Sequence, residues 1–193
     1  MKSIKTRVLV VVLMLGTLVN YANNANLEAN LDAKTIKVAF KDAKKGHQLI
    51  IKNSAGIILH TEQVEKKGDL VKVFDFSKLE NGNYTLELEK DFEIIIKSVK
   101  VKENEIIFDK TSERKIFKPV VRNQANTLMI SKIAFDKKPL EVTLFFNDEV
   151  ILSETVVSEA ILNRVYKLDS EQKGEYKVII RNNNRSYINQ FKI

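Results

Sequence analysis

Apolar and polar residues alternate over many short stretches after residue 34, and a period of two is typical of β-strands that bury one face. Between Gly82 and Glu89, for example, Tyr84, Leu86 and Leu88 fall on one face and the residues between them fall on the other. Such stretches recur every 8–12 residues or so, a spacing that favours an all-β sandwich or barrel. The predicted strands are Ile36–Phe40, Gln48–Lys52, Ile57–Val64, Leu70–Phe76, Tyr84–Glu89, Glu93–Val101, Ile116–Val121, Leu128–Phe135, Glu141–Phe146, Val150–Val156, Asn163–Leu168, Tyr176–Ile180 and Ser186–Ile193.

Residues suited to tight turns separate these stretches. Asn53–Gly56, Asn81-Gly82 and Asn182–Asn184 each lie between two predicted strands and predict hairpin corners, and Asn81-Gly82 supplies residues that tolerate positive φ angles. Ser153–Leu162 is an exception, for which we predict a helical turn.

The second half of the chain repeats the first at an offset of 92 residues, so that Gly82–Leu88 (GNYTLEL) reappears as Gly174–Ile180 (GEYKVII). The same offset places Ile58 on Val150, Leu59 on Ile151, Glu62 on Glu154, Val64 on Val156, Leu70 on Leu162, Val73 on Val165, Phe74 on Tyr166, Ile96 on Ile188, Val99 on Phe191 and Lys100 on Lys192. An offset of this size matches one small β domain. We therefore predict two tandem immunoglobulin-like antiparallel β-sandwiches, over residues 34–109 and 110–193, joined within the mixed-charge segment Lys102–Lys115.

The first 22 residues have the features of an export signal. Lys2, Lys5 and Arg7 precede the apolar run Val8–Val19, and small and polar residues follow it. As a helix this run would be about 18 Å long, which is shorter than the hydrocarbon core of a bilayer, about 30 Å. We predict cleavage after Ala22 or, alternatively, after residue 25, then a flexible segment over residues 23–33 and no stable membrane span; an uncleaved short anchor is the competing interpretation.

Composition excludes several classes of site. The chain has no cysteine, which excludes disulfides, thiol nucleophiles, thiolate zinc sites and a lipid-modified cysteine. The formal net charge of +7 falls to +4 without the three basic residues of the leader. Lysines gather around predicted turns, as between Lys37 and Lys45, while the aromatic residues follow strand patterns, so we predict no nucleic-acid partner.

No catalytic, cofactor-binding or metal site is predicted. The two histidines, His47 and His60, fall in different predicted elements, and a metal site needs three or four converging ligands. The carboxylates of Glu87, Glu89, Asp91 and Glu93 crowd one predicted hairpin, but Lys90 lies among them and argues against a calcium site. We predict a charged, solvent-facing edge there that discourages aggregation.

The repeated G-x-Y unit is the one structural motif that we single out. Gly82 and Gly174 are predicted to close turns at positive φ. Tyr84 and Tyr176 are predicted to bury their rings while each hydroxyl finds a backbone partner, as in a tyrosine corner.

Each repeat also resembles the immunoglobulin-like modules of secreted Bacteroidota proteins, in particular the C-terminal sorting domain of type IX secretion cargo. The residues that carry the resemblance are Leu49–Asn53, Gly56–Ile58, Phe74–Leu86 and Lys97–Val101. The second copy departs from the pattern, with Asn147–Glu149 in place of the turn glycine and Tyr166–Ser170 in place of a D-L-S segment. The resemblance implies an exported protein and, as an alternative, a terminal sandwich that serves as a sorting module.

The sequence thus predicts a non-enzymatic protein located in the periplasm, at the cell surface or in the medium. We expect it to bind a protein or cell-surface partner, or to have a structural role, through a sheet edge or loop tips. The ligand and the oligomeric state leave no sequence signal.

Overall fold

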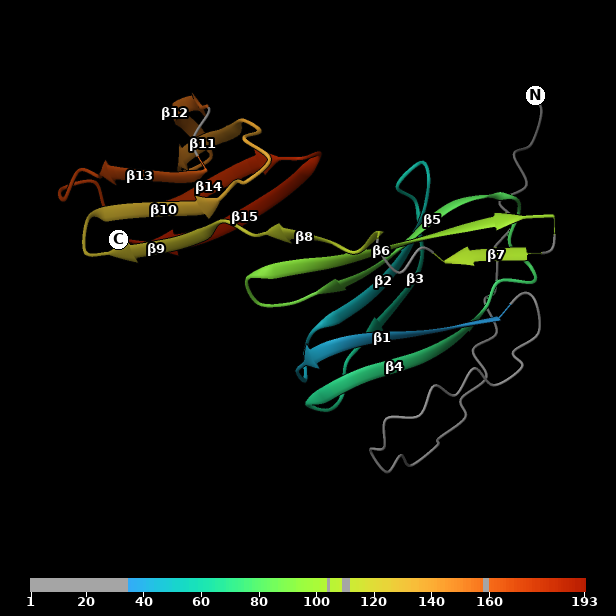
Figure 1. Ribbon diagram of the computed structural model, residues 1–193. Helices are drawn as coiled ribbons and strands as arrows, with labels where there is room; N and C mark the ends of the chain where they lie inside the picture. The colour runs from blue at the N-terminus through green and yellow to red at the C-terminus, as the bar shows by residue number, and fades with distance from the viewer. Residues whose placement is uncertain (1–34, 104, 109–111, 158–159) are drawn as a thin grey trace, which may run out of the picture. The chain divides into compact units, whose positions relative to one another are not determined.

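The computed structural model describes residues 35–103, 105–108, 112–157 and 160–193, and these residues form an all-β protein. The predicted signal peptide and the segment 23–33 lie outside the described residues, as does the predicted boundary at residue 110. The chain divides into two compact units, which meet between Ile116 and Phe117 (Figure 1). No helix long and apolar enough to cross a membrane occurs in the part of the chain that the structure describes.

The first unit is a two-layered sandwich. One layer pairs β1 with β4, and the other has the order β3-β2-β5-β6-β7, with β8 also pairing with β6 (Figure 1). The pairs β1–β4, β2–β3, β2–β5, β5–β6 and β6–β7 are antiparallel, and β2–β3, β5–β6 and β6–β7 are joined by short hairpin connections. The strands are β1 (Thr35–Ala43), β2 (Gln48–Asn53), β3 (Ile58–Gln63), β4 (Gly68–Asp75), β5 (Gly82–Glu89), β6 (Glu93–Lys102), β7 (Glu105–Phe108) and β8 (Arg114–Phe117).

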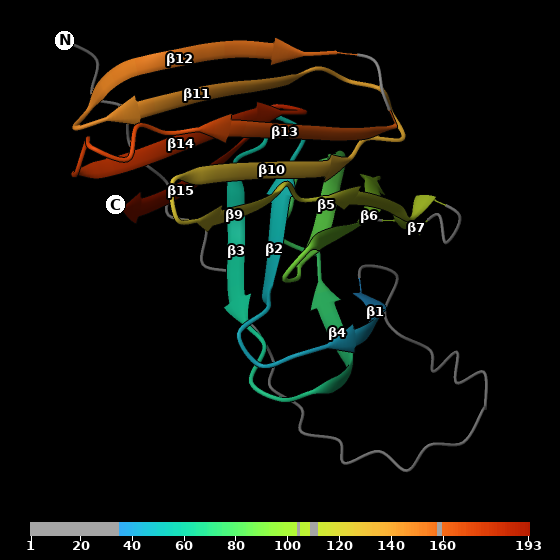
Figure 2. The same ribbon diagram turned by 90° about the vertical axis from the view of Figure 1, so that its left-hand side faces the viewer.

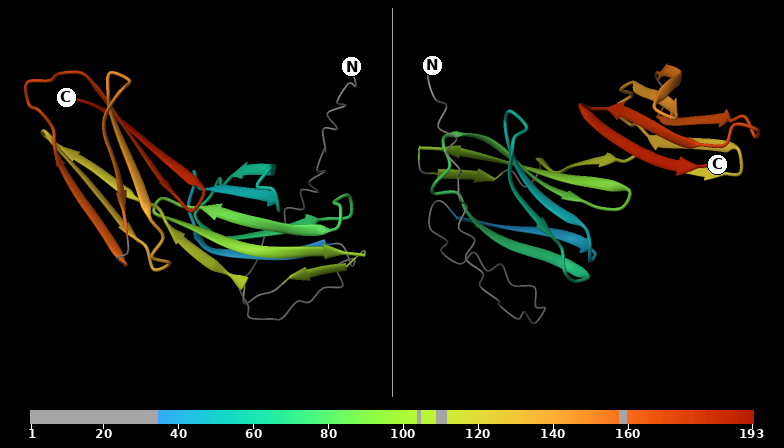
Figure 3. Two further views of the ribbon diagram at one scale, coloured as in Figure 1. Left: turned by 90° about the horizontal axis from the view of Figure 1, so that it is seen from above. Right: turned by 180° about the vertical axis from the view of Figure 1, so that it is seen from behind.

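The second unit has the same two layers with small changes. Its smaller sheet has the order β13-β10-β9 and its larger sheet the order β12-β11-β14-β15 (Figure 2). The strands are β9 (Val120–Gln124), β10 (Thr127–Ile133), β11 (Leu140–Phe146), β12 (Glu149–Val156), β13 (Ile161–Lys167), β14 (Glu175–Asn182) and β15 (Arg185–Lys192). Figure 3 gives two further views of the layers of each unit. The predicted fold class, two tandem immunoglobulin-like β-sandwiches, is confirmed.

The repeat seen in the sequence is also a repeat of strand pairing. Ile36 pairs with Phe74 in the first unit, and Leu128 pairs with Tyr166, both 92 residues later, in the second. Strand β11 is the exception, because Ile51 pairs with Leu86 whereas Leu144, which is 93 residues beyond Ile51, pairs with Val178. Five residues separate Lys52 from its partner Ile58, and four separate the equivalent Phe145 from its partner Val150, which restores the offset of 92 in β12.

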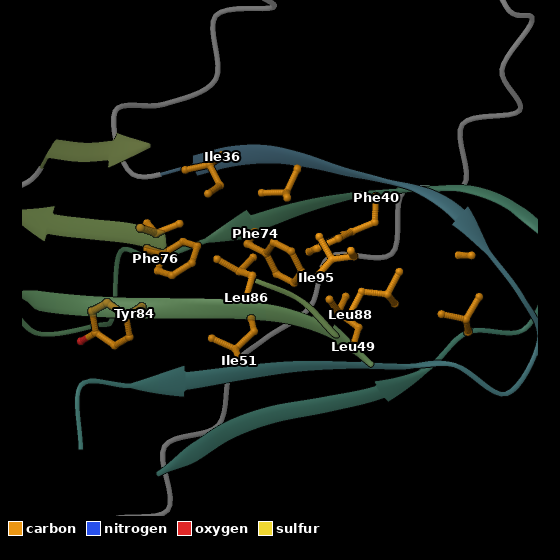
Figure 4. Packing of buried hydrophobic residues seen from close by; sticks show 14 of the residues in the cluster. Ile36, Phe40, Leu49, Ile51, Phe74, Phe76, Tyr84, Leu86, Leu88 and Ile95 are labelled. Carbon is orange, nitrogen blue, oxygen red and sulfur yellow. The ribbon is translucent and has the colours of Figure 1, made fainter. Parts of the chain in front are cut away.

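Each unit has its own apolar core between its two sheets. The inward rows that alternation predicts supply it, and Figure 4 shows Leu86 and Leu88 of β5 on the same side as Phe74 and Phe40, with Tyr84 beside Phe76. The largest buried side chains of the second core come from β10, β11 and β14, and they include Tyr176 and Leu128. Two small cores, each closed by packing alone, hold the described part of this cysteine-free chain together.

Two predicted elements are wrong. The predicted helical turn at Ser153–Leu162 is absent from its described residues, because β12 continues to Val156 and β13 begins at Ile161. The predicted strand Ile116–Val121 is two strands, β8 and β9, since Pro119 cannot donate a ladder hydrogen bond and interrupts the pairing.

Candidate functional site

The two tyrosines of the repeated motif occupy the same structural position. Tyr84 and Tyr176 are 7% and 2% exposed, and their hydroxyls donate to the carbonyl oxygens of Glu80 (2.7 Å) and Gln172 (3.1 Å), each four residues upstream. Burial raises the pKa of both phenols, and the negative charges of Glu80 and Asp169 add to this effect. Both hydroxyls are therefore neutral hydrogen-bond donors that hold a loop and not candidate nucleophiles.

The motif glycines do not adopt the positive φ that we predicted. Neither Gly82 nor Gly174 is in the left-handed region; the glycines that are lie at positions 46, 56 and 68. Gly82 is the first residue of β5 and Gly174 comes just before β14, so both lie at the start of extended backbone, which any residue can adopt. At Gly174 the reason for glycine is space, because an added Cβ would lie 2.6 Å from Cε2 of Phe146, whereas at Gly82 the nearest atom would be 3.8 Å away.

The two histidines have separate structural contacts in the first unit. His47 is buried, its Nδ1 accepts a hydrogen bond from the backbone N–H of Lys44 (3.1 Å), and its Nε2 lies 3.6 Å from Oδ1 of Asp91. Nε2 of His60 lies 3.7 Å from Oε2 of Glu62. Among the described residues no group of three or more His, Asp or Glu side chains could hold a metal ion.

The predicted charged edge at Glu87–Glu93 is wrong in its placement. Strands β5 and β6 both have neighbours on each side, so neither is a free edge. Glu87 is 4% exposed and its carboxylate accepts a hydrogen bond from Nζ of Lys52 (2.8 Å). Alternation places Glu87 on the outer face correctly, but it carries no information on whether that face is covered.

An ion pair recurs between the sheets of both units. Lys72 of β4 contacts Glu62 of β3 at 2.5 Å, and Nε of Arg164 donates to Glu154 at 2.6 Å at the equivalent place. The Arg164 hydrogen bond lowers the pKa of Glu154, and Tyr166 also donates to that carboxylate (3.0 Å). These charges link the two sheets along one side of each sandwich.

Lys132 is a polar group inside the second core. It is 3% exposed, and the offset of 92 places it where the first unit has the buried ring of Phe40. Its ammonium donates to the carbonyl oxygen of Phe117 at 2.7 Å, just before β9. Burial lowers the pKa of this lysine, although the negative charge of Asp136 opposes the shift. The sequence could have indicated this buried lysine, because Lys132 lies 92 residues after Phe40, a core residue of the first repeat. Alternation of apolar and polar residues alone does not indicate it.

The clearest difference between the units lies at one edge of the larger sheet. In the first unit β6 pairs with β7 over Val99–Lys102 and also with β8, and Ser98 N–H donates to Oγ of Ser112 (Figure 1). The equivalent strand β15 is the last strand of its sheet, and no described strand pairs with its far side. Among the described strands, the second sandwich therefore has an open edge at the position where the first continues into β7 and β8.

The residues of β15 that hydrogen-bond to β14 alternate with residues whose backbone groups face this open edge. Gly174 and Ile193 exchange both N–H···O bonds at 3.2 Å, so alternate residues of β15 from Phe191 back to Arg185 bond β14. The backbone groups of the residues in between point away from β14. These are Ser186, Ile188, Gln190 and Lys192, whose side chains are all exposed.

The outer face beside this edge is also exposed in the second unit. Ile188 is 63% exposed, whereas Ile96, at the equivalent position of β6, is 1% exposed. A hollow of about 280 Å³ lies at the Lys192 end of β15, lined by Asn147, Asp148, Lys177, Gln190 and other residues of β14 and β15. Lys177 contacts Asp148 at 2.6 Å there. The hollow has amide and charged groups for polar contacts but neither of the histidines.

No protein-family model matches the sequence, and no curated protein matches it. Among solved structures the chain is similar to "Biofilm associated protein - BSP domain", with 11% sequence identity and a TM-score of 0.28 over 81% of this chain and 27% of that one. It is also similar to "Drosophila OTK, extracellular domains 3-5", with 12% identity and a TM-score of 0.25 over 82% of this chain and 91% of that one. The chain spans about a quarter of the length of the first structure. Likeness at this level transfers no function.

Proposed function

We propose that this chain is an exported, non-enzymatic protein with a binding or structural role outside the cytoplasmic membrane. The observation that supports this role best is the open edge of β15, where unpaired backbone groups and the exposed Ile188 offer a surface for strand pairing. The residues that would be candidates for chemistry have structural contacts instead: Tyr84 and Tyr176 hold loops, and His47 packs in the first unit.

The proposed location rests on the leader of the sequence. Its basic start and apolar run fit an export signal, and a short run of this kind is removed more often than it anchors a chain. The location is tested by expressing the full chain in a bacterial host and treating intact cells and spheroplasts with protease. The chain should be degraded once the cytoplasmic membrane is the only barrier left.

A leader variant provides the matched control. Leu13→Arg places a charge in the apolar run and should leave the chain inside the spheroplasts, whereas Leu13→Ile should behave as the unaltered chain. If the unaltered chain and L13R are equally protected inside spheroplasts, the proposed location is wrong.

A further inference from the structure

We propose that the second sandwich binds a second copy of this chain head to tail, with β15 of one copy pairing with β12 of the next. This inference rests on the proposed binding or structural role, and it names the partner and the two strands that meet. Three properties of the larger sheet of the second unit support it: its two open edges, the direction and phase of its outer strands, and their opposite charges.

Both outer strands of this sheet lack a second neighbour. The order β12-β11-β14-β15 leaves β12 at one edge and β15 at the other, and no described strand covers either of them. In the first unit the edge equivalent to β15 is covered by β7 and β8. The first unit's sheet therefore continues past the position at which β15 is the outer described strand of the second.

The directions of the outer strands suit a repeated arrangement. Every neighbouring pair in this four-stranded sheet is antiparallel, so β12 and β15 also run in opposite directions. A second copy in the same orientation brings its β12 antiparallel to β15 of the first copy. The antiparallel ladder continues through such a contact without a change of type.

The hydrogen-bond phase fits as well. Asn147 N–H donates to Glu175 O, so every second residue of β11, counted back from Asn147, hydrogen-bonds to β14. The residues in between, among them Val142 and Leu144, hydrogen-bond to β12. Ser153 and Thr155 of β12 then point their backbone groups at the open edge. Their side chains are exposed on the outer face, and so are those of Ile188 and of Ser186, Gln190 and Lys192 in β15. A sheet joined through β15 and β12 therefore has the outer faces of both copies on the same side.

The two edges carry opposite charges. Strand β12 exposes Glu149 and has no basic residue, its Glu154 being paired with Arg164 inside the unit, whereas β15 has Arg185 and Lys192 and no acidic residue. The antiparallel arrangement places the Glu149 end of one strand beside the Lys192 end of the other. Exposed apolar side chains accompany the charges on both strands, with Val150 at 59% exposure and Ile188 at 63%.

A head-to-tail contact between different edges does not close on itself and gives open-ended assemblies. We expect sedimentation velocity of the full chain, purified from the fraction in which it accumulates, to show a mass that rises with concentration beyond that of a dimer. A chain that stays monomeric at every concentration overturns the inference, and so does a dimer that grows no further.

Blocking each edge separately tests which strands meet. Ile188→Pro removes an N–H that the fold does not use, and Ser153→Pro does the same on β12. Each variant alone should lose association, whereas an equal mixture of the two should form dimers and nothing larger, because each copy keeps one open edge. Association of S153P with itself would indicate a β15–β15 contact and overturn the inference.

Charge variants guard against misfolding of the proline variants. Ile188→Glu sets a carboxylate against the acidic β12, and Ser153→Lys sets a cation against the basic β15, so both should reproduce the proline results with backbone donors intact. The matched control is Thr61→Pro at the equivalent position of β3 in the first unit, which should associate as the unaltered chain does. Loss of association in T61P would place the contact on the first unit and overturn the inference.

The outcomes separate this inference from the proposed function. A chain that is delivered outside the cytoplasmic membrane but stays monomeric leaves the proposed location standing and removes the assembly. A chain that associates through β12 and β15 but stays in the cytoplasm leaves the assembly standing and removes the proposed location.

Discussion

Phe40 and Lys132 occupy the same place in two copies of one fold, and they show how the copies differ. The ring of Phe40 is part of an apolar core, while Lys132 is buried at the equivalent position and donates to the carbonyl oxygen of Phe117. The two units also differ at one edge of the larger sheet, because β6 has strand partners on both sides and β15 has a described partner on one side. Apart from the position of Phe40 and Lys132, both units have inward apolar rows, and the other difference lies at an edge of the larger sheet.

This comparison separates what the fold requires from what is free to change. The tyrosine hydroxyls and the ion pairs of Glu62 and Glu154 recur because they join loops and sheets in either unit. The strands β7 and β8, which pair with the far side of β6, have no described counterpart beside β15, and the second sandwich still has its apolar core. An open edge is usually a liability for a protein, and β15 lacks, among the described strands, the second neighbour that β6 has at the equivalent position, which is the reason to seek its partner.

The largest expected effect comes from giving the first unit the lysine of the second. Phe40→Lys buries an ammonium in an apolar core and places it near Lys97, whose Nζ lies 5.4 Å from the centre of the ring of Phe40. We expect a loss of about 4 kcal/mol or more in the free energy of unfolding of the first unit. Guanidinium unfolding followed by circular dichroism measures it, and a stability close to that of the unaltered chain would show that the two positions are interchangeable.

The motif glycines should respond unequally. Gly174→Ala drives a Cβ against the ring of Phe146 and should cost about 1–3 kcal/mol, whereas Gly82→Ala should stay within about 0.5 kcal/mol. Thermal unfolding of the two variants compares them directly. Equal losses would mean that the motif needs glycine for its backbone conformation and not for space.

Replacing the buried lysine should stabilise the second unit. Lys132→Met keeps the length of the side chain and removes the desolvated charge, at the expense of the hydrogen bond to Phe117, and we expect a net gain of about 1 kcal/mol near neutral pH. The lowered pKa sets the pH dependence: unfolding frees a lysine that binds a proton more readily, so the unaltered chain gains stability as the pH rises from the folded toward the unfolded pKa. The advantage of K132M should shrink over that alkaline range. A variant less stable than the parent at neutral pH would make the hydrogen bond the dominant contribution.

The smallest effect concerns the repeated ion pair. Glu154→Gln should cost about 1 kcal/mol or less, because the pair is partly exposed to solvent. The pKa of Glu154 is lowered by the hydrogen bond from Arg164, so its contribution is complete above the unfolded pKa of about 4.3 and is lost as the pH falls through the folded value. Stability curves of the two chains should therefore converge at acid pH. Curves that stay parallel would assign the effect to something other than this charge.

Local sequence signals predicted the strands and the inward rows, because a period of two is a property of neighbouring residues. The offset of 92 residues also predicted that two like folds follow each other, and the strand pairing follows it except at β11. The same signals failed at Glu87, whose burial depends on what covers the outer face of the sheet, and at Gly82, whose turn does not use positive φ.

The candidate site could not be read from the sequence for a related reason. Whether β6 or β15 has a second neighbour depends on the return of residues 105–117 to the edge of a strand that precedes them, and that segment has a mixed charge pattern with little alternation. Ile96 and Ile188 are identical residues at equivalent positions, yet one is buried and the other is exposed. Only the pairing in space separates them.

Hydrogen exchange of individual backbone amides tests the difference between the two edges most directly. In dilute, monomeric protein the amide of Ser98 should be protected by its hydrogen bond to Ser112 and that of Lys100 by β7, while those of Gln190 and Lys192, each 92 residues later, should exchange rapidly. The amides of Val99 and Phe191, which face β5 and β14, should be protected alike and serve as the internal control. Equal protection of Gln190 and Ser98 under these conditions would contradict the account, because it would mean that both edges are closed.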